Sequence, residues 1–167
     1  MEEIDSLIAE LRRFSSNIAE LKTAVDAQLI VRFESEHHLA LPIDYKLTVA
    51  QVNGFSIMGA EVYGLYGRTS SLSLESIYHR EHIDVSYPQP PYIIPFSSDG
   101  GGNFYCFDTR FKSADEQSSP VVFWVSNYPY TEDDPPATTN NSFLDFVNEV
   151  IIGWTLDDYD YEGNEKK

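Results

Sequence analysis

Three consecutive glycines, Gly100 to Gly102, interrupt the stretch YIIPFSSDGGGNFYCFD that runs from Tyr92 to Asp108. Backbone amides in such a triplet can approach an anion closely, so the triplet is a candidate cradle for a phosphate. Both common phosphate-binding fingerprints open a helix, however, and the P-loop carries a lysine after its glycines. Here no lysine follows, and the next residues form an aromatic, strand-like run. We therefore interpret the stretch as a β-hairpin with a wide turn, with phosphate binding as the alternative.

The four histidines are candidate ligands for a metal ion. His79 and His82 lie three residues apart with Glu81 between them, and His37 and His38 are adjacent, so they cannot both point inward from one helix. A zinc site needs three or four converging ligands and groups that orient them. These candidates are scattered, so we predict no metal and no cofactor.

The remaining nucleophiles do not form a recognisable catalytic motif. No serine lies in a nucleophile elbow or beside an oxyanion-hole motif. Cys106 is the only cysteine and lies in an apolar strand pattern, which is typical of a buried, inert thiol and excludes an intramolecular disulfide. The sequence therefore predicts a protein that is not an enzyme and that resides in a reducing compartment.

The charge balance restricts the kinds of partner. The chain has 27 acidic and 11 basic side chains, a formal net charge of -16. Nucleic acids and anionic lipids are usually bound through clustered lysine and arginine, so we exclude both as direct partners. An acidic surface instead speeds encounter with a basic protein. The alternative is that the acidity serves solubility alone.

The length and the hydropathy pattern predict one domain in the cytoplasm. A chain of 167 residues is long enough to bury a core of its own. The first residues, MEEIDSLIAELRRF, contain early acids and no unbroken apolar run, so they do not resemble a secretory signal. No stretch approaches the ~18 consecutive apolar residues that cross a bilayer.

Apolar residues at spacings of three and four predict helices at both ends of the chain. The first covers the segment from Ile4 to Phe14, the second begins at about Thr23, and a short third one ends before Asn53-Gly54. The last begins at Ser142, a suitable N-cap. We expect one face of this last helix to be buried, namely Phe143, Phe146, Val147, Val150, Ile151 and Trp154.

Strand-like runs fill the middle of the chain. From Phe55 onward these are FSIMG, EVYGLYG and SLSLESIY, followed by the two arms of the hairpin and by VVFWVSN. We interpret residues 128–141 as a long exposed loop and residues 155–167 as an acidic tail that is mobile or only loosely docked. Helices first and strands next indicate an α+β fold.

The order of the landmarks resembles the SUKH superfamily, the Smi and Knr type of domain. The landmarks are LPIDYK, QVNGF, YGLYG, IPFSSDGGGNFYCFD, PVVFW and SFLDFVNEV, and together they cover residues 25–154. Residues 1–24 then form an N-terminal helical segment and residues 155–167 the acidic tail of one globular unit. Tyr63 and Tyr66 lie where the family has a tryptophan-centred signature, which leaves the subfamily open.

The resemblance implies a single α+β domain with a mixed or mainly antiparallel sheet, packed by N-terminal helices and a C-terminal amphipathic helix. Bacterial proteins of this kind are commonly immunity proteins that neutralise a cognate toxin domain, often a nuclease, of a polymorphic or contact-dependent toxin system. The alternative is a protein-interaction or regulatory module, as in fungal cell-wall regulation. The positions that match the family and that we interpret as structural are Leu41, Pro42, Tyr45, Asn53, Gly54, Pro95, Gly101, Asp108, Phe143 and Phe146.

Two acidic segments also contain tyrosines, which are favoured anchors at protein interfaces. Carboxylates beside them would complement the basic groove with which a nuclease holds its substrate. We therefore predict that one of these segments binds a basic toxin domain, the alternative being that the acids only keep the segments solvated. The candidate residues are Tyr128, Tyr130, Glu132, Asp133 and Asp134 in the loop and Asp157, Asp158, Tyr159 and Asp160 in the tail.

Overall fold

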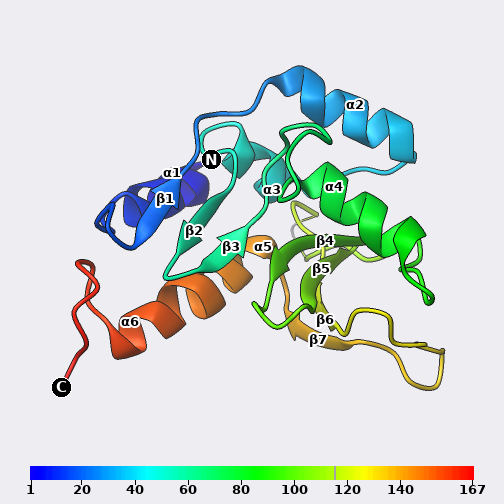
Figure 1. The fold of residues 1–167 in the computed structure, drawn as a ribbon. Coiled ribbons are helices and arrows are strands. Elements are labelled where there is room, and N and C mark those ends of the chain that lie inside the picture. Colours follow the sequence, from blue (N-terminus) through cyan, green and yellow to red (C-terminus); the bar gives the residue numbers. More distant parts are fainter. Residues whose placement is uncertain (115) are drawn as a thin grey trace.

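A computed structural model describes residues 1–114 and 116–167 (Figure 1). Seven strands form one antiparallel sheet in the order β1-β2-β3-β4-β5-β6-β7, so each strand pairs with its neighbours in sequence. The predicted α+β class and the predominantly antiparallel sheet are confirmed. The strands are β1 Ala19–Leu21, β2 Phe55–Ile57, β3 Ala60–Val62, β4 Ile93–Ser98, β5 Phe104–Asp108, β6 Val121–Trp124 and β7 Ala137–Asn140.

Helices precede, interrupt and follow the sheet (Figure 1). Two of them, η1 and η2, have the wider π-helical turn and continue the α-helices before them. The helices are α1 Glu2–Leu11, α2 Ala27–His37, α3 Ile43–Val49, α4 Leu74–His79, η1 Arg80–Asp84, α5 Phe143–Phe146, η2 Val147–Gly153 and α6 Trp154–Asp158.

The centre of the core is aromatic and joins the sheet to α5. Phe96 of β4 stacks on Phe107 of β5, with 4.1 Å between the ring centroids. Phe143 meets Phe96 edge to face at 5.6 Å, and Tyr45 of α3 meets Phe143 at 5.4 Å. All four side chains are fully buried. Such edge-to-face and offset pairs stabilise a core beyond the area they bury, so this cluster fixes α3 and α5 against the sheet.

The glycine-rich stretch forms the predicted hairpin. Strands β4 and β5 pair antiparallel, with Ile94 opposite Phe107, and the turn between them contains the glycine triplet. The carboxylate of Asp99 accepts hydrogen bonds from the amides of Gly101, at 2.7 Å, and Asn103, at 2.9 Å. The protein thus supplies its own anion to the amide of Gly101, the middle glycine of the triplet that suggested a phosphate cradle.

Two segments form different elements from those predicted. Residues 71–78, SLSLESIY, contain the start of α4 rather than a strand, because Ser73 caps a helix by accepting a hydrogen bond from the amide of Ser76 at 3.2 Å. The second helix begins at Ala27 rather than at Thr23, since Asp26 is its N-cap. In addition, β1 was not predicted, and β7 occupies the end of the segment interpreted as a loop.

The prediction for the C-terminal helix is correct at its start and wrong at its end. The hydroxyl of Ser142 accepts a hydrogen bond from the amide of Asp145 at 3.0 Å, as an N-cap does. Trp154, however, is 60% exposed, although we expected it on the buried face. The intervening η2 has more residues per turn than an α-helix, so it rotates Trp154 away from the row of apolar residues before it.

Candidate functional site

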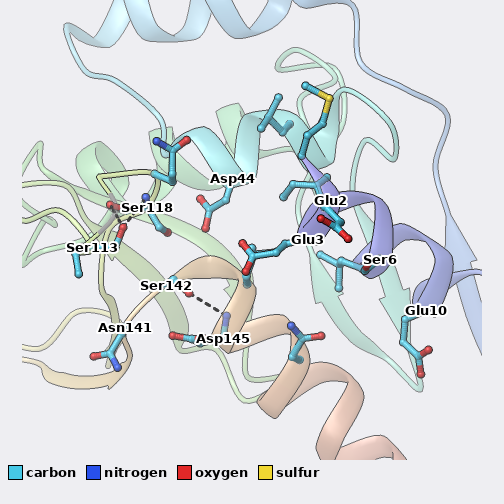
Figure 2. Close-up of a pocket in the computed structure, with 18 residues that line it drawn as sticks. Glu2, Glu3, Ser6, Glu10, Asp44, Ser113, Ser118, Asn141, Ser142 and Asp145 are labelled. Carbon is cyan, nitrogen blue, oxygen red and sulfur yellow. Dashed lines mark hydrogen bonds between the residues drawn. The ribbon is translucent and has the colours of Figure 1, made fainter.

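A groove of about 930 Å³ opens between α1, α3, α5 and residues 113–114 and 117–118 (Figure 2). Its apolar lining includes Leu7 from α1, Leu47 from α3 and Leu144 from α5. Leu7 is buried, Leu144 is half-buried and Leu47 is 37% exposed. Four segments that are far apart in sequence therefore form one concave surface with an apolar floor.

Carboxylates surround this floor. Glu2, Glu3 and Glu10 come from α1, Asp44 from α3 and Asp145 from α5. Figure 2 shows Glu3 projecting toward the space between α3 and α5. Among the lining residues that the structure describes, none is lysine, arginine or histidine. The groove is therefore suited to a partner that is both apolar and positively charged.

Hydrogen bonds fix the walls of the groove. The hydroxyl of Ser118 accepts a bond from the amide of Phe143 at 3.0 Å, which holds Ser118 to the start of α5. The carbonyl of Gln117 accepts bonds from the amides of Ile43, at 2.8 Å, and Asp44, at 3.1 Å. Gln117 and Ser118 therefore join α3 to α5, and the groove is formed by the fold itself.

The loop with the first set of predicted binding residues connects β6 to β7. The hydroxyl of Tyr128 donates to the carboxylate of Asp134 at 2.6 Å, and this bond raises the pKa of Tyr128. Tyr130 is half-buried, with its ring 4.5 Å from that of Trp124. Glu132 and Asp133 are exposed at the tip. The loop therefore presents Tyr128 and three carboxylates, while Tyr130 belongs to its packing.

The second set of predicted residues lies at the end of the chain. Asp157 and Asp158 are exposed in α6, and Tyr159 is half-buried and pairs with Glu165 in an isolated β-bridge. Bonds from the side chain and amide of Asn164 lower the pKa of Asp160. Figure 1 shows the end of the chain and the β6–β7 loop on opposite sides of the molecule. The fold does not bring the two sets together.

The tail is docked on α1, contrary to our expectation that it is mobile or only loosely docked. The ring of Tyr161 lies 4.9 Å from that of Phe14, and the guanidinium of Arg13 lies over it at 3.9 Å. The hydroxyl of Tyr161 donates to Glu10, and its carbonyl accepts from the amide of Ser15 at 2.8 Å. Glu10 also pairs with Arg13, so the carboxylate at this end of the groove already has partners.

The histidines serve packing between α2 and α4. The ring of Tyr78 stacks on that of His82, with 3.7 Å between the ring centroids. The ring of His37 lies 4.4 Å from that of Tyr78. Burial lowers the pKa of His82 and of His37. His38 ends α2 in the left-handed conformation. Across residues 1–114 and 116–167, no three histidine, cysteine or acidic side chains are grouped as metal ligands would be.

The positions that match the family lie in the interior, with one exception. Nine of the ten are buried, and Gly101 is exposed in the hairpin turn. The amide group of Asn53 donates to the carbonyl of Leu65 and accepts from its amide, both at 2.8 Å. Asp108 forms a two-bond pair with Arg110, and the hydroxyl of Tyr45 donates to the carbonyl of Tyr63 at 2.6 Å.

Sequence reasoning missed the groove. Glu2 and Glu3 lie in the first turn of α1, where acidic side chains favour the helix dipole. Asp145 lies in the first turn of α5, and Leu47 lies on the short helix α3. No spacing in the sequence connects these positions, because their proximity arises from the packing of α1, α3 and α5.

Comparisons with known proteins agree with the fold. The model of the family described as SMI1 / KNR4 family (SUKH-1) matches residues 24–149. A solved structure, described as the crystal structure of a protein from Pseudomonas syringae pv. tomato, is similar with a TM-score of 0.62 and 18% sequence identity. The similarity covers 92% of this chain and 99% of that chain, and at this identity it shows the fold alone. No curated protein matches the chain.

Within the described residues, no helix is long and apolar enough to span a membrane.

Proposed function

Because the chain belongs to the SMI1 / KNR4 family (SUKH-1), we propose that it is a non-enzymatic immunity protein. It binds and neutralises a cognate, basic toxin domain, such as a nuclease, of a bacterial polymorphic or contact-dependent toxin system. The observation that carries the proposal is the net charge of -16 on a domain of this family. A protein that must occupy the basic surface of a toxin needs such a charge, because carboxylates there replace the phosphates of the toxin's substrate.

Physical properties of the structure support binding as the activity. Exposed carboxylates lie on the β6–β7 loop, on α6 and, at Glu2 and Glu3, beside the groove, where a partner can reach them. Its strongest nucleophile, Cys106, is fully buried, and burial raises the pKa of the thiol well above the ordinary value. His82 is stacked and bonded to backbone carbonyls. These side chains contribute to packing, which suits a rigid binding module in the cytoplasm.

Co-expression with a toxin domain tests the proposed function. The toxin encoded immediately beside this gene is produced in a sensitive host, with and without the full chain. We expect the chain to restore growth, and we expect the two proteins to copurify. A toxin of a different class serves as the control and should remain toxic. Persistent toxicity in the presence of soluble, folded protein would overturn the proposal and favour the alternative, an interaction or regulatory module without a toxin partner.

The β6–β7 loop is the first candidate contact within this proposal. Replacing Glu132, Asp133 and Asp134 with serine removes three exposed charges. We expect association with the toxin to slow by about tenfold at low ionic strength, and the dependence of the rate on salt to become weaker. Stopped-flow fluorescence at two salt concentrations measures both quantities.

Serine substitutions of Asp157, Asp158 and Asp160 form the matched variant, because they remove the same number of charges from the opposite side of the molecule. An unchanged rate and salt slope in the loop variant would exclude the loop as a contact. A slower rate in the tail variant alone would assign the contact to the tail.

A further inference from the structure

We propose that the groove between α1, α3 and α5 binds a short cationic, amphipathic helix of a partner protein. The occupant presents lysine or arginine to the rim of the groove and an apolar side chain to its floor. This inference rests on the proposed function only for the identity of the protein that carries the helix. The argument for the occupant comes from the charge, the exposed apolar surface and the rigidity of the groove.

The charge of the rim selects a cationic occupant. Glu2 and Glu3 are exposed on α1, and Asp145 is half-buried on α5. Within the described part of the chain, none of these three carboxylates takes part in an ion pair. Each can therefore accept a charge-assisted hydrogen bond from a lysine or arginine without losing an existing partner.

The floor of the groove requires that the occupant also be apolar. Leu47 on α3 is 37% exposed, and Leu144 on α5 is half-buried. Apolar side chains this exposed on a short helix bury area when a partner covers them, at about 25 cal/mol per Å². A helix with apolar residues on one face and basic residues beside them satisfies the floor and the rim together.

The volume and the rigidity of the groove suit a helix. The space of about 930 Å³ is of the size that ligand-binding clefts have, and it accommodates several side chains at once. The bonds that Ser118 and Gln117 accept from amides at the starts of α5 and α3 hold two walls in place. The side chain of Gln51 donates to Asp5 at 3.0 Å and so links the residues after α3 to α1. A preformed site loses little conformational entropy on binding.

A synthetic peptide tests the inference without a toxin. The peptide has about 14 residues, roughly four helical turns, with leucine on one face and lysine beside it. Its control has glutamate in place of each lysine. We expect fluorescence anisotropy to show binding of the lysine peptide to the full chain, weakening with salt, and no binding of the glutamate peptide.

Two variants with the same net charge locate the site. Glu3→Gln with Asp145→Asn removes two charges from the groove, and Glu36→Gln with Asp84→Asn removes two from exposed positions on α2 and η1. We expect the groove variant to bind the lysine peptide about fivefold more weakly and the control variant to bind it as the parent protein does. Equal weakening in both variants would indicate attraction by net charge alone and would overturn the inference.

Cross-linking separates this inference from the proposed function. Cys106 is fully buried, so Leu47→Cys introduces a single accessible thiol that can carry a photoactivatable group. We expect it to cross-link to the toxin of the co-expression experiment. Val31→Cys, on α2 at a position 61% exposed, is the control and should not cross-link. A neutralised toxin without a cross-link from Leu47→Cys overturns the groove and leaves the immunity role standing. Peptide binding in the groove without neutralisation of the toxin would overturn the immunity role and leave the groove inference standing.

Discussion

Replacing Phe143 with alanine is expected to lower the free energy of unfolding by about 4 kcal/mol, which is typical of deleting a large aromatic side chain from a packed core. Phe143 is fully buried, and its ring contacts those of Tyr45, Phe96 and Phe107. It lies one residue after the N-cap of α5, so the cavity opens where the helix meets the sheet. Stability is measured by urea denaturation followed by tryptophan fluorescence.

Phe111→Ala is the matched control for this loss. Phe111 is 55% exposed and contacts Arg110 through its ring, at 5.2 Å. We expect its removal to change stability by no more than about 0.5 kcal/mol, as is usual for exposed positions. Similar losses in the two variants would mean that the aromatic cluster is not the centre of the core.

Replacing Gly64 with alanine is expected to lower the free energy of unfolding by about 3 kcal/mol, because overpacking against fixed backbone forces the chain to shift. A Cβ at position 64 would lie 2.3 Å from the carbonyl oxygen of Asn53 and 2.4 Å from its side-chain oxygen. Asn53 cannot move aside, since its side chain holds both backbone polar groups of Leu65. Displacing it would leave two buried groups without partners.

Gly101→Ala is the control for the Gly64 variant. Neither glycine has a positive φ, so alanine causes no backbone strain at either position. A Cβ at position 101 would meet only the Asp99 carboxylate, at an ordinary 3.4 Å. We expect a change within about 0.5 kcal/mol, since alanine also lowers the entropy of the unfolded chain. A large loss for Gly101→Ala would show that the turn requires glycine there. Thermal unfolding of both variants measures the difference.

The central part of the fold was predictable from local pattern. Apolar runs on both sides of a glycine-rich break predicted the β4–β5 hairpin, and the apolar run VVFWVSN predicted the strand that is β6. Ser142 marked the start of α5 because a capping serine acts on the residues next to it. These signals are strong because each depends on a few neighbouring residues.

The errors arose where distant residues decide the structure. β7 is largely exposed and polar, and it becomes a strand only because β6 supplies its hydrogen-bonding partner. Trp154 was placed on the wrong face because the pattern assumed a regular α-helix through η2. The tail packs on Phe14, which lies at the other end of the sequence. No local periodicity contains such information.

Of the two candidate surfaces, only the β6–β7 loop could be predicted from local sequence, whereas the groove could not. The tyrosine and acidic residues of the β6–β7 loop are adjacent in sequence, so a search for mixed acidic and aromatic segments finds them. The groove joins Glu3, Leu47 and Asp145 across most of the chain, and its shape depends on the hydrogen bonds that Gln117 and Ser118 accept. A surface formed in this manner becomes visible only after the helices have been placed in space.

The contact between Tyr161 and Glu10 spans 151 positions of sequence, whereas every strand pairs with its immediate neighbour in the chain. Because long loops close more slowly than short ones, we expect the sheet to fold first and the contact between α1 and the end of the chain to form last. We accordingly expect the backbone amides of α1 to exchange with solvent faster than those of the β4–β5 hairpin. An intermediate without α1 would retain most of the sheet but lose one wall of the groove, so a partner that binds there would recognise only the completed protein.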